Sequence, residues 1–236
     1  MNLRRQAPAE MTTLTAWIDI GRSSSCRARL LTASKSLFAR FGYEQSSTAA
    51  IAREAGTSES QLVRYFETKA GLLRAVFDES WRPLNEQVRR VIAASGTARQ
   101  AMLAVAAAVE QVFGEDPELA FLFLLEGRRV RGAKREIILS DGLLAFEEQM
   151  RRLVLRGQAD GSFSKALSHC AIAAAVNGAM EGMVRDRLVA ARSGERPAFS
   201  EGEINQVLVV LLDGLSPRAE CESSTLGKAK ASPTQG

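Results

Sequence analysis

The stretch Ser47-Thr-Ala-Ala-Ile-Ala-Arg-Glu-Ala-Gly-Thr-Ser-Glu-Ser-Gln-Leu-Val-Arg-Tyr-Phe66 predicts two short helices joined by a tight turn. Gly56 is suited to the left-handed backbone conformation that ends a helix. Ser58 then stands at an N-cap position, three residues before Gln61, which is the spacing of a capping box. Two short helices joined by a turn that contains glycine are the signature of a helix-turn-helix motif.

Helices on both sides of this motif supply the hydrophobic core that so short a pair lacks. Apolar residues at helical spacing precede the motif as far as Gly42, and a second set follows it. The positions expected to face the core are Leu30, Ala33, Leu37, Phe38, Phe41, Ala50, Ile51, Ala52, Ala55, Leu62, Tyr65, Phe66, Leu72, Leu73, Val76 and Phe77.

Three segments carry a wider pattern at fixed spacing. They are Ala33-x-x-x-Leu37-Phe38-x-x-x-Gly42-Tyr43-Glu44, Ile51-Ala52-x-x-Ala55-Gly56-x-Ser58 and Leu62-x-x-Tyr65-Phe66-x-x-Lys69-x-x-Leu72. Together they resemble the amino-terminal domain of the TetR family of transcriptional regulators. The resemblance covers only the amino-terminal part of this 236-residue chain. It implies an all-α fold, in which a three-helix helix-turn-helix domain precedes a larger helical regulatory and dimerisation domain.

Composition and motifs argue against several other classes of protein. Hydrophobic residues make up 46% of the chain and charged residues 25%, as in soluble globular proteins. The three cysteines are scattered and form no CxxC pair, so we expect no disulfide framework, no metal site and a reducing, cytoplasmic location. No apolar run reaches the roughly 18 residues of a membrane span, and no signal peptide is evident. The single histidine, His169, has no nucleophile motif, and nucleotide-binding motifs are missing, so we predict no catalytic residues and no cofactor.

The distribution of charge points to a polyanionic partner. The formal net charge is +4, yet residues 22–75 alone hold nine basic and four acidic side chains. The positive excess therefore lies in the helix-turn-helix segment, where a nucleic acid would bind. Small basic domains are common, so this charge excess alone is weak evidence for DNA binding, but it agrees with the helix-turn-helix motif.

The second helix of the motif carries the predicted reading surface. In helix-turn-helix proteins, the amino-terminal residues of this helix face the edges of the bases in the major groove. Arg64 can bind guanine, Gln61 adenine and Glu59 the amino group of cytosine. Two alternatives remain open. Gln61 can instead cap the helix at Ser58, and Glu59 can instead stabilise the helix dipole in the first turn.

Phosphate contacts are expected on both sides of the reading helix. Hydroxyl groups cluster where the first helix of the motif begins; one must cap that helix, and the others can bind a phosphate. By the resemblance, Lys69 clamps a phosphate, whereas Val63 and Ser60 stand where the family often has tyrosine and glycine. Tyr65 can contact DNA or belong to the core. The residues predicted to contact DNA are Ser46, Ser47, Thr48, Ser58, Glu59, Ser60, Gln61, Arg64, Tyr65 and Lys69.

The remainder of the chain predicts further helices and shows no strand signal. A helix that starts near Lys69 should be kinked or interrupted at Pro83. Asp116-Pro117 is an N-cap followed by a proline suited to the first helical position, and Ser200-x-x-Glu203 is a capping box. The predicted helices are Gly96–Phe113, Glu118–Arg129, Ile137–Arg156, Lys165–Arg192 and a last helix that runs from Ser200 through Leu212.

The resemblance also implies a small-molecule effector bound among the central helices. For each aromatic candidate the alternative is an ordinary core position, and for Glu126 it is a surface charge at a helix end. The candidate lining residues are Phe113, Phe121, Phe123, Glu126, Phe146, Met150, Asn177 and Glu181.

The last two helices are the predicted dimer interface. Alanine and glycine residues in the long helix allow close helix approach, and Val207–Leu212 is apolar almost all round, as expected for burial on two sides. By the resemblance, these helices pair with their copies in a four-helix interface; the alternative is a buried helix pair within one chain. Two-fold symmetry would place two reading heads roughly 34–36 Å apart on a palindrome.

The predicted organisation has four parts: a flexible arm at 1–23 (Met11 is an alternative start), a TetR-type helix-turn-helix domain at 24–84, a helical ligand-binding and dimerisation domain at 85–215, and a disordered tail at 216–236.

The predicted function is that of a homodimeric repressor, not an enzyme, which binds a palindromic operator in double-stranded DNA and is released by an unidentified small molecule. Two alternatives remain: a DNA-binding dimer without ligand gating, acting as an activator or architectural factor, and a helical small-molecule-binding or enzymatic protein whose basic domain is incidental.

Overall fold

The structure is a computed structural model, and it describes residues 25–126, 130–131, 136–137, 139–197 and 199–217. The predicted arm at 1–23 and all but the first two residues of the predicted tail at 216–236 lie outside the described residues.

Helices make up nearly all of the described chain, so the all-α prediction is confirmed. They are α2 (Cys26–Gln45), α3 (Thr48–Glu54), α4 (Glu59–Phe66), α5 (Lys69–Ala94), α6 (Ala98–Glu115), α7 (Pro117–Leu125), α8 (Asp141–Asp160), α9 (His169–Ser193) and α10 (Glu201–Gly214).

One short antiparallel ladder was not expected from the sequence. Its strands are β1 (Val130–Arg131) and β2 (Glu136–Ile137), with Val130 paired to Ile137. The helix that we predicted to begin at Ile137 begins instead at Asp141, because Ser140 caps it through the Leu143 N–H at 3.1 Å. The expectation of no strand was therefore wrong for these four residues.

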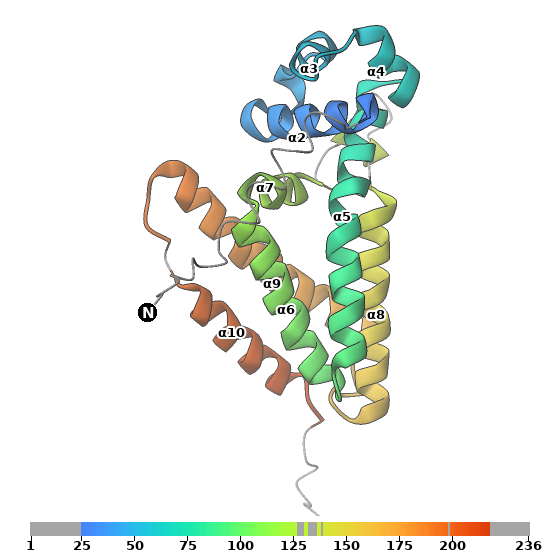
Figure 1. The fold of residues 1–236 in the computed structure, drawn as a ribbon. Coiled ribbons are helices and arrows are strands. Elements are labelled where there is room, and N and C mark those ends of the chain that lie inside the picture. Colours follow the sequence, from blue (N-terminus) through green and yellow to red (C-terminus); the bar gives the residue numbers. More distant parts are fainter. Residues whose placement is uncertain (1–24, 127–129, 132–135, 138, 198, 218–236) are drawn as a thin grey trace, which may run out of the picture.

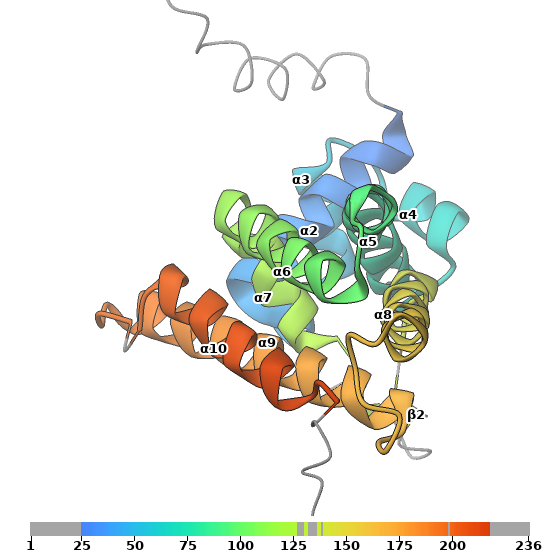
Figure 2. The same ribbon diagram turned by 90° about the horizontal axis from the view of Figure 1, so that it is seen from below.

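The helices form a head and a body (Figure 1). In the head, α2, α3 and α4 gather around the first turns of α5. In the body, α5 and α8 lie side by side along the long axis of the molecule, and α6 packs against both. Helix α7 lies between α2 and α9, while α9 and α10 lie side by side at one edge (Figure 2).

Helix α5 joins the head to the body. It runs through Pro83 without interruption, and it contacts α2 and α4 near its start and α6 and α8 further along. The predicted domain boundary at residue 84 falls within this helix. A shift of α5 in the body would therefore reach the head through a continuous rod.

Most of the helices begin at a polar cap, as their sequences predict. At each of these starts, a side-chain oxygen accepts a hydrogen bond from a backbone N–H three residues later, which satisfies an otherwise unpaired donor. Ser200 and Glu203 form the predicted capping box of α10, and Asp116 and Pro117 open α7 as expected. The capping residues are Ser25, Ser47, Ser58, Thr68, Thr97, Asp116, Ser140 and Ser200.

The predicted core positions of the head are largely buried, but two aromatic predictions differ. Phe41 is 53% exposed and Tyr65 is 44% exposed. At Gly42 the backbone takes φ 79° and ψ 165°, so the helical conformation is broken directly after Phe41. Tyr43 is buried in its place, with its ring centroid 5.3 Å from that of Phe38. The core then continues from the head into the body without a break.

Candidate functional site

The turn between α3 and α4 has a fixed geometry. Gly56 adopts φ 62°, the Gly56 N–H donates to the Arg53 carbonyl at 3.1 Å, and the Thr57 N–H donates to the Ala52 carbonyl at 2.9 Å. These two bonds form a Schellman motif, which requires the left-handed residue that glycine supplies at low cost. Arg29 of α2 also donates to the Ala55 carbonyl at 3.1 Å, so the turn is tied to the head.

Helix α4 buries one face and exposes the other. Leu62 and Phe66 are buried, with exposed fractions of 0% and 7%. Glu59, Ser60 and Arg64 are exposed on the outer side, together with Val63 and Tyr65. The predicted base-reading side chains of α4 therefore lie at the surface, apart from Gln61, which is half-buried.

The helix cap at Ser58 leaves the Gln61 side chain for another role. The Ser58 hydroxyl oxygen accepts from the Gln61 backbone N–H at 3.3 Å, and it also bonds the Ser60 hydroxyl at 2.8 Å. In α6 and α10 the third residue returns a side-chain bond to the cap, but α4 has only the forward half of this box. Glu59 is held by the Thr48 hydroxyl, which joins the starts of α3 and α4.

The two serines before α3 have different roles. Ser47 caps the helix by accepting from the Ala50 N–H at 3.1 Å, and its side chain is exposed. Ser46 is 2% exposed, and its hydroxyl donates to the carbonyls of Leu37 at 3.1 Å and Gly42 at 2.8 Å. The prediction that Ser46 contacts DNA is therefore corrected, because its single proton serves the interior of the head.

Lys69 lies beside the reading helix, at the start of α5. Its ammonium group is 4.2 Å from the centroid of the Tyr43 ring and 3.4 Å from the Glu44 carbonyl oxygen. Thr68 caps the same helix end by accepting from the Gly71 N–H at 2.9 Å. The lysine is half-buried and orientated by these contacts, so its position is set before any ligand arrives.

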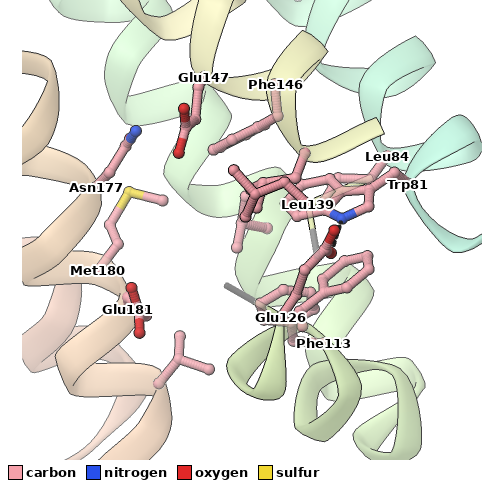
Figure 3. A pocket seen from close by; sticks show the side chains of 14 residues that line it. Trp81, Leu84, Phe113, Glu126, Leu139, Phe146, Glu147, Asn177, Met180 and Glu181 are labelled. Atoms are coloured by element: carbon pink, nitrogen blue, oxygen red, sulfur yellow. Dashed lines mark hydrogen bonds between the residues drawn. The ribbon is translucent and has the colours of Figure 1, made fainter. Parts of the chain in front are cut away.

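A second candidate site is a cavity of about 490 Å³ in the body (Figure 3). Side chains from α5, α6, α7, α8 and α9 line it, and Asn177, Met180 and Glu181 face Trp81 and Phe146 across it. Volumes of this size accommodate small organic ligands. The lining residues are Trp81, Leu84, Val109, Phe113, Phe123, Glu126, Leu139, Leu143, Phe146, Glu147, Asn177, Met180, Glu181 and Val184.

Buried Glu126 organises one wall of this cavity. Its Oε2 accepts from the Trp81 indole N–H at 2.6 Å, and its Oε1 accepts from the Ser140 backbone N–H at 2.7 Å. Burial raises the pKa of Glu126 above its ordinary value of 4.5, although these hydrogen bonds oppose the rise. The Trp81 ring stacks on Phe123 with centroids 4.1 Å apart, so the carboxyl and the aromatic wall form one unit.

Six of the eight predicted cavity residues line the cavity. Phe121 and Met150 are the exceptions. The Phe121 ring lies 3.6 Å below the Arg192 guanidinium, and Met150 is fully buried in the core. The sequence reading missed Trp81 and Glu147, among others. The helical spacing of α5 marks Trp81 as an inward residue, but nothing local shows that it borders a void.

Polar contacts join the body to the head in the described chain, including one between Ser36 of α2 and Glu118 of α7 at 3.5 Å. Arg192, near the end of α9, donates to the Ala39 carbonyl of α2 at 2.8 Å. Lys35 of α2 pairs with Asp116, the residue that caps α7. Both α7 and α9 also border the cavity, so the same helices contact the head and the candidate ligand site.

An uncovered apolar face runs along α10 and α9. Ile204, Leu208 and Leu212 of α10 are buried within the chain, whereas Val207 is 49% exposed and Val210 71% exposed. On α9, the exposed residues include Ala171, Ala174, Ala175, Gly178 and Val189, which are small or apolar, and also the charged Glu181, Asp186 and Arg192.

Among the described residues, no group of three or more His, Cys, Asp or Glu side chains is placed to hold a metal ion. None of the helices in the described ranges combines the length and hydrophobicity that a membrane span requires. His169 begins α9 and lies 3.4 Å from the Cys170 sulfur.

Sequence comparison gives a family for the head. Residues 30–76 match the family model of the bacterial regulatory proteins, tetR family. The amino-terminal domain belongs to the TetR family. No curated protein matches the chain. In this TetR-type domain, α3 and α4 are the helix-turn-helix pair, and α2 and α5 are the helices that support it.

Solved structures share the fold over most of the chain. FadR, a fatty acid degradation regulator from Bacillus halodurans, superposes with a TM-score of 0.68 at 19% identity and covers 80% of this chain and 98% of its own. FadR from Bacillus subtilis in complex with stearoyl-CoA gives 0.67 at 20% identity, covering 80% and 97%. The ketosteroid regulator KstR2 from Mycobacterium tuberculosis gives 0.59 at 17%, covering 84% and 98%. The body behind the TetR-type head therefore has the fold of these regulators as well.

Proposed function

We propose that this protein is a homodimeric transcriptional repressor that binds a palindromic operator and is released by a small molecule. The exposed polar face of α4 is the observation that carries the proposal. That face projects from a capped, tightly packed helix pair in a segment with nine basic and four acidic residues. A helix of this kind fits the major groove of DNA. Because the operator would be chromosomal, the protein would act in the cytoplasm.

The proposed DNA contacts divide into base contacts and phosphate contacts. Arg64, Gln61 and Glu59 would read base edges, with Arg64 best suited to guanine. Ser47 and Lys69 would bind phosphates on either side of the reading helix, together with Thr48, Ser58, Ser60 and the exposed Tyr65. Val63 is also exposed, and its side chain offers a methyl surface rather than a hydrogen bond.

Dimerisation through α9 and α10 would cover the apolar face that a single chain leaves open. Val210 is 71% exposed, and the neighbouring outward positions of α9 carry alanine and glycine. Small residues let two helices approach closely, and a two-fold axis would place the same face on both partners. Two heads are needed because the recognition helix of one head reads only a few base pairs.

Release by a ligand would work through the helices that join cavity and head. Helices α7 and α9 border the cavity and hold α2 through Asp116 and Arg192, while α5 carries Trp81 and supports α4. A ligand that fits better when these helices are displaced would favour a dimer whose heads no longer match successive major grooves. It can shift this balance only by its difference in affinity for the two shapes. The complex of Bacillus subtilis FadR with stearoyl-CoA supports the idea that this fold can bind a small molecule.

Selection of bound DNA from a random pool tests the DNA-binding part. We expect recovery of a palindrome, with retention in gel shift that weakens steeply as salt rises, because phosphate contacts release counterions. Arg64→Ala should relax one base position in each half-site, whereas Lys69→Ala should weaken all sequences alike. Ser46→Ala serves as a control, since its hydroxyl faces inward. Recovery of no consensus sequence would refute the proposal.

A further inference from the structure

The polar groups that line the cavity are three carboxyl groups, the Asn177 amide and the Trp81 indole N–H. Three of the lining residues are glutamates, and the described residues that line it include no lysine, arginine or histidine. The one donor on the aromatic wall, the Trp81 indole N–H, is already bonded to Glu126. A ligand with an anionic head would therefore find acceptors and negative charge, and no cation to pair with.

Asn177 adds an acceptor that the protein itself leaves unused. Its Oδ1 atom is buried and has no hydrogen-bond partner among the described residues. Burying an acceptor without a partner costs free energy, and a ligand donor could recover that cost if the Asn177 amide turned this oxygen toward the cavity. Figure 3 shows this side chain on α9, between Glu147 and Met180. A protonated amine carries donors, whereas a carboxylate or a thioester carries only acceptors.

Aromatic side chains form the wall of the cavity opposite the polar groups of α9. Trp81, Phe113, Phe123 and Phe146 line one side, with Trp81 and Phe146 centroids 5.2 Å apart. The faces of such rings attract organic cations, tryptophan most strongly, and their area binds apolar groups. A cation with an apolar body would thus contact rings on one side and the acceptors of α8 and α9 on the other.

We propose that the cavity binds an amphiphilic organic cation, such as a protonated amine on an alkyl or aromatic body. The proposal rests on the proposed function only in taking this cavity as the effector site. Glu147 and Glu181 would face the charged group, and the buried Glu126 would hold the indole against which the body of the ligand lies. Arg151 lies 3.2 Å from Glu148 and 3.6 Å from Glu147, so its closer ion pair is outside the cavity lining.

Matched ligands of opposite charge test this proposal. The chain has two tryptophans, Trp17 and Trp81, so a Trp17→Phe background leaves Trp81 as the only tryptophan reporter of cavity occupancy. Quenching of its fluorescence would be titrated with decylammonium, decanol and decanoate below their aggregation limits. A rigid pair, tetraphenylphosphonium and tetraphenylborate, would control for chain flexibility. We expect roughly tenfold tighter binding of decylammonium than of decanol, with decanoate weaker still.

Variants that remove the charge of a single glutamate test which carboxylates bind the ammonium group. Glu147→Gln and Glu181→Gln should each weaken decylammonium roughly three- to tenfold and leave decanol unchanged. Glu86→Gln is the control, because this exposed glutamate of α5 lies outside the cavity lining, and its loss should change neither affinity. Tighter binding of either anion than of its matched cation would overturn the proposal, as would the absence of binding by both cations.

The ligand titrations test the cation proposal independently of the proposed DNA-binding function. The fluorescence titrations contain no DNA, so a cation preference can be established whether or not an operator is found. If decylammonium binds the cavity but leaves retention of selected DNA unchanged, ligand gating fails and the ligand class stands. If selected DNA is bound and released only by an anion, the gating stands and the ligand class is wrong.

Discussion

The hydrogen bond between Trp81 and Glu126 can be tested by removing either partner. Trp81→Phe keeps the aromatic stack on Phe123 but deletes the N–H that donates to Glu126 at 2.6 Å. A hydrogen bond to a charged or buried acceptor contributes about 1.5–3 kcal/mol, and the smaller ring leaves part of the indole volume empty. We therefore expect Trp81→Phe to lower the free energy of unfolding by about 2–4 kcal/mol.

A double-mutant cycle isolates the bond itself. In Glu126→Gln, an NH2 group replaces one of the two carboxylate oxygens that accept from Trp81 and Ser140, so one of these donors faces another donor. When residue 81 is phenylalanine, no indole N–H is present to lose its acceptor, so the Glu126→Gln substitution no longer carries this cost. The two substitutions together should therefore cost about 1–2 kcal/mol less than the sum of their separate costs.

The same bond predicts a dependence on pH. Burial raises the pKa of Glu126, so the folded state holds this proton more tightly than the unfolded state. The contribution of Glu126 to stability is then greatest below its ordinary pKa of 4.5 and falls as pH rises through the folded pKa. Since the Trp81 bond opposes the rise, Trp81→Phe should raise the pKa further and cost more stability at neutral pH than in acid.

Urea unfolding followed by far-ultraviolet circular dichroism provides the measurement, at one fixed protein concentration and several pH values. Circular dichroism is needed because the substitution removes the fluorescent reporter. Strictly additive costs, within about 0.5 kcal/mol, would refute the coupling. A Trp81→Phe cost that did not change between acid and neutral pH would show that Glu126 is not the acceptor whose charge this bond stabilises.

Three further predictions concern the body of the protein. Gly142→Ala should destabilise the fold by about 1–3 kcal/mol in urea unfolding, because an added Cβ would lie 2.3 Å from the Cβ of Trp81; an unchanged midpoint would contradict this packing. Val210→Asp should weaken self-association at least about tenfold in analytical ultracentrifugation without changing the circular dichroism spectrum, since Val210 is 71% exposed in the single chain. Arg192→Ala should cost no more than about 1 kcal/mol of stability because the side chain is exposed, yet it should alter DNA affinity in gel shift, and an unchanged affinity would argue against coupling through α9.

Local signals in the sequence located the helix starts well. A serine, threonine or aspartate cap is a short-range feature, since its side chain bonds an N–H only three residues away. The starts of α3, α4, α7 and α10 followed from such residues. The start of α9 did not: the prediction began at Lys165, whereas the helix begins at His169 and its N-cap Ser168 makes no side-chain bond.

The predictions of side-chain burial failed where a contact distant in sequence or a backbone break determines the position of the side chain. Phe41 fits the helical spacing of α2, but it stands in the last turn before the backbone break at Gly42, and it is exposed. Ser46 looks like its neighbours in sequence, yet its hydroxyl is bonded to Leu37, nine residues earlier. Glu126 was equally compatible with a surface position at a helix end, and only the approach of Trp81, 45 residues away, makes it buried.

The sequence alone determined the all-helical class, the capped helix pair and the positive charge around it, because these depend on residue spacing and on bonds within a few positions. Only the tertiary structure decided that a cavity exists, that Trp81 and Glu147 border it, and that Arg192 holds the head. These features depend on how helices far apart in the chain pack. A void forms where their side chains fail to fill the space between them, and no single segment carries that information.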